Sequence, residues 1–265
     1  MRTAILIPAR FASSRYPGKP LIELRGATGV AKPLIQRSYE AARRVGGSGD
    51  VSVVTDDDRI AAASEAFGAP VIMTSPDCGN GTERCAEAIG QLGDVDLIVN
   101  LQGDALLTPA HFVEALIAHM REDREAQVAT PAVQLRSADV RMLQREEAEG
   151  RLGGTSVVTD DRGRALYFSK RLIPHLPKGA LDEPLSPVRL HVGVYAYRRE
   201  ALELYARTPP SQLELLEGLE QLRFLTAGVA VDVVEVDRPP FGLRELNNPE
   251  DLEPIEQALA EAGLE

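Results

Sequence analysis

Apolar residues in the first half of the chain form short runs that alternate with stretches of helical spacing. The strand-like runs are residues 4–7, 51–54, 71–73 and 95–101. Apolar positions three or four apart predict helices over residues 33–44, 59–67, 82–91 and 109–120. This alternation favours a parallel sheet with helices on both faces, and such sheets bind ligands beyond the carboxyl ends of their strands.

The pattern changes from about residue 137. Two short apolar runs, 157–159 and 165–168, flank Asp160-Asp161-Arg162-Gly163, which is typical of a hairpin, and a proline-rich stretch follows over 174–187. We therefore expect one domain, 1–265, with a lid or insertion at about 135–200. The later elements expected are a strand over 191–197, a helix over 213–226, a strand over 231–236 and a helix that begins at Pro249.

Composition narrows the possible partners. A formal charge of −11 argues against a nucleic-acid partner. Because the chain has no apolar run of about eighteen residues and no signal-peptide pattern, we expect a soluble, cytoplasmic protein without a membrane partner. The two cysteines, Cys78 and Cys85, lack the spacing of a metal or redox motif, so reduced thiols are expected.

Three cations follow the first strand in a loop stiffened by proline. Arg10, Arg15 and Lys19 are separated by small residues and by Pro17. A single cation after a strand is usually just solvated, but three in an ordered loop can neutralise a polyphosphate that the backbone approaches closely. The loop lacks the glycine–lysine spacing of a P-loop, so the sequence predicts a phosphate site of another kind.

Polar residues also follow the third and fourth strand-like runs. Asp104 comes directly after the fourth run, where a carboxylate facing a triphosphate predicts a Mg²⁺ ligand, and Gln102 shares its strand face. Asn80, Gly81 and Arg84 come after the third run. A plain turn before a helix would also explain Asn80 and Gly81, but explains Arg84 less readily.

Six segments, in order, resemble the signatures of the 3-deoxy-manno-octulosonate (Kdo) cytidylyltransferases, also called CMP-Kdo synthetases. The first reads Ile-Pro-Ala-Arg-Phe-Ala-Ser-Ser-Arg-Tyr-Pro-Gly-Lys-Pro-Leu, and the second and third are Asn-Gly-Thr-Glu-Arg and Asn-Leu-Gln-Gly-Asp. The others are Ala-Leu-Tyr-Phe-Ser-Lys, His-Val-Gly-Val-Tyr-Ala-Tyr-Arg and Leu-Glu-Gln-Leu-Arg. Each motif alone is weak, but together they span nearly the whole chain.

The resemblance implies an α/β, three-layer Rossmann-like nucleotidyltransferase fold with a mixed central sheet and an inserted lid or dimerisation region. It implies that a hydroxyl of Kdo attacks the α-phosphate of CTP with the help of Mg²⁺, giving CMP-Kdo and diphosphate for lipopolysaccharide biosynthesis. It also implies a homodimer.

Site residues follow from the same motifs. The resemblance implies that CTP is bound by Pro8, Ala9, Arg10, Arg15, Lys19, Asn80, Gly81, Thr82, Arg84 and Gln102. It implies that the sugar acid is bound by Gln102, Lys170, His191, Tyr195, Glu220 and Gln221. The residues expected to be catalytic are Arg10, Arg15, Lys19 and Asp104, and those expected to hold the metal are Asp104 and Asn247. Tyr197 is instead expected to pack in the core.

The chain departs from the family pattern at several positions. Asn247 stands where the family has its second metal-binding aspartate, and Glu245 offers a carboxylate two residues earlier. Ala105-Leu106 replaces a Glu-Pro pair, and Lys170 replaces an arginine, which keeps the charge but loses the planar fork.

Two alternative functions share the same phosphate loop. One is cytidylyl transfer to a related acid: 8-amino-Kdo, another ulosonic acid or a phosphonate. The other is a non-catalytic nucleotide-binding regulator, which the loss of a metal carboxylate at Asn247 suggests and the intact cationic loop opposes.

Overall fold

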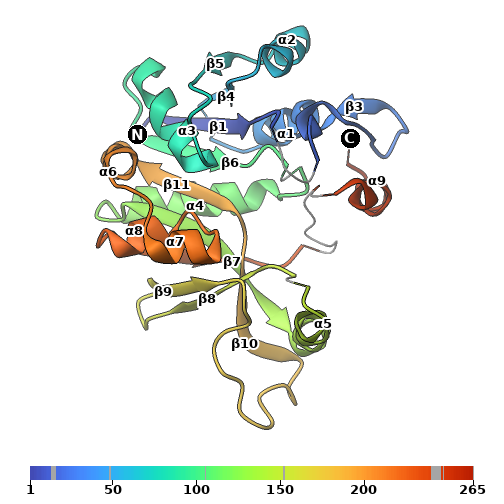
Figure 1. The fold of residues 1–265 in the computed structure, drawn as a ribbon, viewed down its shortest axis with the longest axis vertical. Helices are drawn as coiled ribbons and strands as arrows, with labels where there is room; N and C mark the ends of the chain where they lie inside the picture. The colour runs from blue at the N-terminus through green and yellow to red at the C-terminus, as the bar shows by residue number, and fades with distance from the viewer. Residues whose placement is uncertain are drawn as a thin grey trace.

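The computed structural model describes residues 1–12, 16–47, 49–104, 106–151, 153–239, 246 and 248–264. Within them, ten strands form one mixed sheet (Figure 1). The spatial order is β5 (Val71–Met73), β4 (Asp50–Thr55), β1 (Thr3–Ala9), β6 (Leu97–Leu101), β11 (Val194–Arg198), β7 (Val128–Arg136), β10 (Leu185–His191), β8 (Thr155–Thr159) and β9 (Ala165–Ser169). The tenth strand, β12 (Val231–Glu235), pairs with β7.

The sheet changes direction between β6 and β11. β5, β4, β1 and β6 are parallel neighbours. β11 is antiparallel to β6, and each later neighbour in the order, out to β9, is antiparallel to the one before it. The carboxyl ends of the four parallel strands therefore meet at one edge of the sheet, which is where ligands of such sheets bind.

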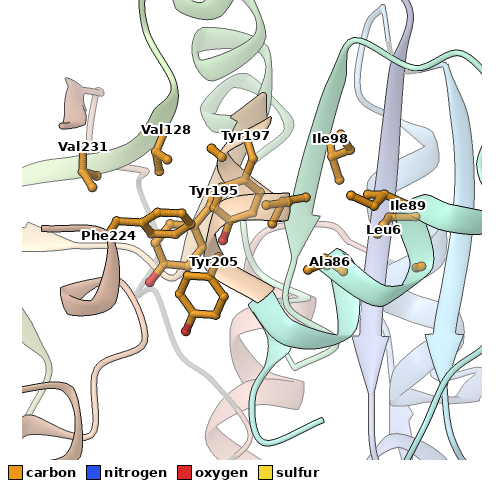
Figure 2. Packing of buried hydrophobic residues seen from close by; sticks show 14 of the residues in the cluster. Leu6, Ala86, Ile89, Ile98, Val128, Tyr195, Tyr197, Tyr205, Phe224 and Val231 are labelled. Carbon is orange, nitrogen blue, oxygen red and sulfur yellow. The ribbon is translucent and has the colours of Figure 1, made fainter. Parts of the chain in front are cut away.

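Strand β1 buries side chains on both of its faces. Ala4 and Leu6 belong to a core with α3 (Gly81–Ala88), α6 (Arg199–Arg207) and α8 (Leu222–Thr226), part of which Figure 2 shows. Ile5 and Ile7 pack on the opposite face with α1 (Leu34–Arg43), α2 (Asp58–Ala66) and α4 (Ala110–Glu122). A continuous apolar run is what a strand between two helical layers requires. The expected three-layer α/β fold with a mixed central sheet is confirmed.

A third apolar cluster holds the carboxyl-terminal helix. It joins α9 (Leu252–Glu261) to the two-stranded sheet of β2 (Glu23–Arg25) and β3 (Ala31–Pro33). The short helix η1 (Lys19–Leu21) precedes β2, and η3 (Pro249–Asp251) leads into α9. A further short helix, η2 (Ile89–Gln91), continues from α3.

Two expectations for the second half of the chain are wrong. The single helix expected over residues 213–226 is two helices, α7 (Gln212–Glu217) and α8. A capping box of Ser211 and Glu214 starts α7, and Gly218, at φ +62°, ends it. The strand expected over residues 191–197 is also interrupted, because β10 ends at His191 and β11 begins at Val194.

The region around residues 135–200 extends the central sheet. The expected hairpin is present as β8 and β9, whereas β7 and α5 (Ser137–Ala148) were not predicted. Figure 1 shows β8, β9, β10 and α5 extending away from the parallel half of the sheet. A lid or dimerisation role for this region stays a prediction. Among the described residues, no helix has the length and apolar character needed to cross a membrane.

Candidate active site

A cleft of about 980 Å³ opens at the carboxyl ends of the parallel strands. Most of the predicted site residues line it: Pro8, Ala9, Arg10, Lys19, Asn80, Gly81, Arg84, Gln102, Asp104, His191, Tyr195, Glu220 and Gln221. The side chains of Thr82 and Lys170 are not among its lining residues. Arg15, Glu245 and Asn247 lie outside the described residues. Segments that are far apart in the sequence thus bring most of the predicted site residues together in one cleft.

The phosphate loop places a cation against the carboxylate at the end of β6. Lys19 Nζ lies 2.5 Å from Asp104 Oδ2, and both side chains are partly exposed to the cleft. Gly18 allows this approach, because its φ of +72° suits glycine and a Cβ there would lie 3.0 Å from the Phe11 ring. The loop therefore sets Lys19 beside Asp104 at the strand edge.

Asp104 has the chemistry of a Mg²⁺ ligand. Its carboxylate is partly exposed at the cleft, opposite the cationic loop. Among the described residues, no three carboxylate, imidazole or thiol groups converge as a metal cluster would require. A Mg²⁺ ion at this carboxylate would complete its shell with phosphate oxygens and water, which is how Mg²⁺ is usually held at nucleotides. Asp104, which is paired with Lys19 in this structure, would be the carboxylate to hold such an ion.

The amino terminus of α3 forms a wall of the cleft. Asn80 caps this helix by accepting a hydrogen bond from the Glu83 N–H at 2.8 Å. Gly81 packs so closely that a Cβ there would lie 2.8 Å from Gln102 Nε2 and 3.3 Å from Pro8 Cγ. The Thr82 N–H donates to Glu220 Oε2 at 3.0 Å, and the Thr82 hydroxyl lies 2.8 Å from the Tyr197 hydroxyl. Thr82 thus faces the core with Tyr197, which is fully buried as expected.

Arg84 lines the cleft and is nevertheless almost fully buried. Its guanidinium lies 2.9 Å from Asp56 Oδ1 and donates to Thr74 Oγ1 at 2.6 Å. Asp56 and Thr74 directly follow β4 and β5, so Arg84 joins α3 to the ends of two parallel strands. The Arg84 guanidinium therefore fixes the position of α3 relative to the ends of β4 and β5.

A half-buried carboxylate, Glu220, also lines the cleft. Glu220 accepts from Gln102 Nε2 at 3.1 Å as well as from the Thr82 N–H. Burial raises the pKa of Glu220 above its ordinary value, while the hydrogen bonds from Thr82 act in the opposite direction. Glu220 and Gln102 therefore form one polar unit between the two halves of the cleft.

The wall formed by β10 and β11 carries aromatic and amide groups. His191 Nε2 lies 2.9 Å from Thr130 Oγ1, and the His191 ring makes an edge contact with Phe168 at 5.1 Å between centroids. Tyr195 donates from its hydroxyl to Gln221 Oε1 at 3.1 Å. Gln221 Nε2 is buried and has no hydrogen-bond partner in the part of the chain that the structure describes. These groups offer hydrogen bonds to a hydroxylated ligand.

Lys170 is not among the lining residues of the cleft, but its side chain lies against Gly218, which is. Its backbone N–H donates to Glu217 Oε2 at 2.9 Å, and its ammonium lies 2.9 Å from where a Cβ on Gly218 would be. Gly218 lines the same cleft as Glu220 and Gln221, so Lys170 lies next to that wall. Its part in binding a sugar acid stays a prediction.

Sequence reasoning gave no role to several residues near the cleft. Glu214 and Cys78 line it, and Arg223 binds Glu214 beside it. Arg223 is the last residue of the Leu-Glu-Gln-Leu-Arg motif, but the motif does not predict which residues it contacts. Burial and the Glu87 carboxylate raise the pKa of the Cys78 thiol to about 12, which keeps this cysteine protonated and unreactive.

A mixed α/β sheet with a cationic loop and a carboxylate at its strand ends fits a nucleotidyltransferase. A cytidylyltransferase family model matches residues 4–233. The 3-deoxy-manno-octulosonate cytidylyltransferase of Maricaulis maris is 39% identical, with 99% of each chain covered. The 8-amino-3,8-dideoxy-manno-octulosonate cytidylyltransferase of Shewanella baltica is 40% identical, with 98% of this chain and 99% of that protein covered.

A solved structure agrees with these relatives. A CMP:2-keto-3-deoxy-manno-octonic acid synthetase complexed with CTP superposes with a TM-score of 0.84 at 37% identity, covering 99% of this chain and 100% of its own. The chain belongs to the 3-deoxy-manno-octulosonate cytidylyltransferase family, which confirms the resemblance seen in its motifs. A more distant cytidylyltransferase from Leptospira borgpetersenii, 15% identical with a TM-score of 0.60, shares the fold.

Proposed function

We propose that the protein transfers the cytidylyl group of CTP to Kdo and releases CMP-Kdo and diphosphate, as a step of lipopolysaccharide biosynthesis. The observation that carries the proposal is the cleft itself. It joins Lys19 and Asp104 on one side to Glu220 and His191 on the other, with Gln102 between them, in a chain that matches Kdo cytidylyltransferases along its full length. The CTP in the similar solved structure supports CTP as the donor.

The reaction needs positioning and charge neutralisation. A hydroxyl oxygen of Kdo bonds to the α-phosphorus as the bond from that phosphorus to the diphosphate oxygen breaks. Arg10 and Lys19 would hold the triphosphate and neutralise the charge that develops on it. Gln102 and Glu220 would bind hydroxyl groups of the acid, and Gln221 Nε2 has a hydrogen bond to offer.

Asp104 would hold a Mg²⁺ ion together with the phosphate oxygens of CTP. When bound, Mg²⁺ neutralises phosphate charge and orients the leaving diphosphate. Asn247 and Glu245 remain candidates to complete the site, and Arg15 remains a candidate phosphate ligand. We further propose that the protein is a cytoplasmic homodimer, on the basis of the family resemblance.

The test is a diphosphate-release screen. Purified protein is incubated with each of CTP, UTP, ATP and GTP against Kdo, 8-amino-Kdo and a second ulosonic acid, with Mg²⁺ varied. We expect release with CTP and Kdo that requires Mg²⁺, and none with the purine nucleotides. A higher kcat/KM for 8-amino-Kdo would assign the chain to the acceptor of its Shewanella relatives. If the protein binds CTP but releases no diphosphate with any of the acids, the result would support the alternative of a non-catalytic nucleotide-binding regulator.

A further inference from the structure

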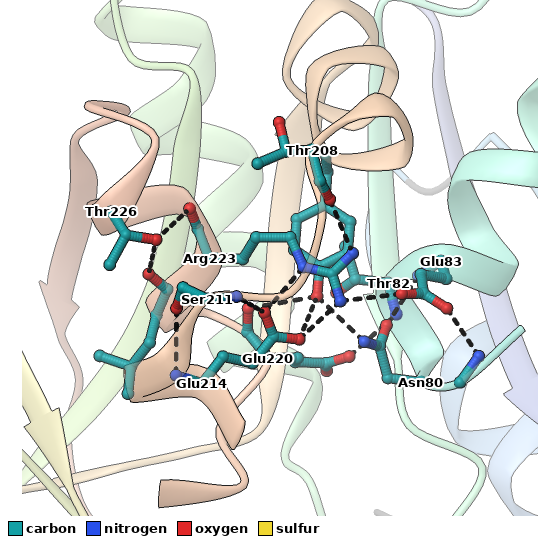
Figure 3. Close-up of polar contacts among 12 residues, drawn as sticks. Asn80, Thr82, Glu83, Thr208, Ser211, Glu214, Glu220, Arg223 and Thr226 are labelled. Atoms are coloured by element: carbon teal, nitrogen blue, oxygen red, sulfur yellow. Dashed lines mark hydrogen bonds and ion pairs between the residues drawn. The ribbon is translucent and has the colours of Figure 1, made fainter. Parts of the chain in front are cut away.

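A largely buried ion-pair network fastens the first turn of α3 to α6, α7 and α8 (Figure 3). Arg223, in α8, donates from Nε to Glu214 Oε2 at 2.8 Å and from Nη2 to Glu214 Oε1 at 2.6 Å. The same Nη2 lies 2.8 Å from Glu83 Oε1, in α3. The guanidinium also stacks on Tyr205, 4.1 Å from the ring centroid. One side chain therefore ties together α3, α6, α7 and α8.

The network continues from Glu83 to the phosphate loop. The Gly79 N–H donates to Glu83 Oε2 at 2.6 Å, and the Gly79 carbonyl accepts from Arg10 Nη1 at 3.4 Å. Asn80 Nδ2 donates to the Tyr205 hydroxyl at 3.0 Å. The segment from Gly79 to Gly81 lines the cleft, so its backbone is held on one side by Glu83 and on the other by Arg10.

Charge and burial show that Arg223 fixes Glu83. The Arg223 and Glu214 side chains are 3% and 8% exposed, whereas Glu83 is 24% exposed and reaches in from the rim. Glu214 holds the guanidinium through two parallel bonds from Nε and Nη2, while Nη2 also meets Glu83 and Nη1 donates to the Thr208 carbonyl at 3.3 Å. A lysine has no planar fork and could not serve both carboxylates in this geometry.

We propose that Arg223 is a positioning residue for the nucleotide, which acts through Glu83 to fix the Gly79–Gly81 wall and, through Gly79, the phosphate-binding Arg10. The proposal rests on the proposed function, because it assumes that this wall faces CTP. It also makes the helix pair α7–α8, which carries the acceptor residues Glu220 and Gln221 between its members, responsible for the shape of the CTP site.

The test compares Glu83→Gln with Glu147→Gln. Both glutamates are 24% exposed and lie 2.8 Å from an arginine, but Glu147, in α5, pairs with Arg171, and neither residue lines the cleft. Glu83→Gln keeps an acceptor for Gly79 and removes the charge that Arg223 holds. We expect the KM and the Kd for CTP to rise about tenfold, the KM for Kdo to stay within about twofold, and Glu147→Gln to match the parent protein.

Arg223→Lys is the second variant and should weaken CTP binding in the same direction. The proposal is overturned if Glu83→Gln binds CTP as the parent does, whatever happens to its melting temperature, or if the KM values for CTP and Kdo rise equally. CTP binding is measured by calorimetry without an acceptor. A parent protein that binds CTP but makes no CMP-Kdo would therefore contradict the proposed function while leaving this comparison intact.

Discussion

The surroundings of His191 determine its hydrogen bonding and its protonation state. Thr130 has a single hydroxyl proton, and its Oγ1 donates to the Val194 carbonyl at 2.8 Å. With that proton engaged, Oγ1 can accept a hydrogen bond from His191 Nε2, which lies 2.9 Å away. Burial lowers the pKa of His191 to about 3 from its ordinary 6.5, so this imidazole is neutral near pH 7. A neutral ring suits hydrogen bonding to a hydroxyl of the acid.

This lowered pKa predicts a pH dependence of stability. Between pH 6.5 and about 3, the unfolded chain protonates this histidine while the folded chain does not. Stability therefore falls as the pH drops through this range. Denaturant unfolding of the parent and of His191→Gln between pH 7.5 and 5.0 should show the parent losing more free energy of unfolding. Equal losses in the two proteins would refute the prediction, and His175→Gln, at an exposed histidine, serves as the control.

At the scale of elements, the amino terminus of α3 is the part on which the site depends most. Asn80 caps the helix, and Gly81 leaves no room for a side chain beside Gln102. The Thr82 N–H binds the Glu220 carboxylate, and the Glu83 carboxylate binds the Arg223 guanidinium. Its contacts connect the phosphate loop, β6 and α8. A small displacement of this turn would alter both ends of the cleft.

Gly81→Ala tests the tight packing of this turn. The added methyl would contact the Gln102 amide at 2.8 Å and displace it from Glu220. We expect kcat/KM for CTP to fall by about ten- to a hundred-fold, while thermal stability changes little because alanine suits a helix. Gly90→Ala is the matched control, since nothing lies within 4 Å of its Cβ position. Unchanged kinetics in Gly81→Ala would show that the close contact is unimportant.

The elements that the sequence predicted best are those with strong local signals. The runs of the parallel strands are apolar on both faces, and their periodicity is visible without tertiary knowledge. By contrast, β7 contains Pro131, which normally argues against a strand, and α5 buries only Ser137 and Val140, too few for a clear apolar stripe. The break at Gly193 was hidden by the alternation of His191, Tyr195 and Tyr197.

The site residues that could be predicted are those that belong to a motif or directly follow a strand. Asp104 and Gln102 follow from their place after β6, and the cations of the loop follow from their spacing. The partners of Arg84 and Arg223 did not follow, because Asp56 and Glu83 are brought to them by the fold and not by local sequence. Lys170 was placed by resemblance alone, and its ammonium lies against Gly218 at the edge of the cleft.

At the scale of the whole molecule, the change of strand direction creates the cleft. The parallel half supplies the phosphate loop and Asp104, while β10 and β11 supply His191 and Tyr195. The segment between α7 and α8 supplies Glu220 and Gln221 and closes the far side. Two ligands can therefore meet between the two halves of one sheet, which is what group transfer requires.

The most direct test of this account is ³¹P NMR of the protein with CTP, Kdo and Mg²⁺. The account predicts that the CTP signals are replaced by one phosphodiester signal of CMP-Kdo and an equal amount of diphosphate, and that no change occurs when Kdo is omitted. CTP that stays intact with Kdo present, or that is hydrolysed to CMP without a sugar phosphodiester, would contradict it.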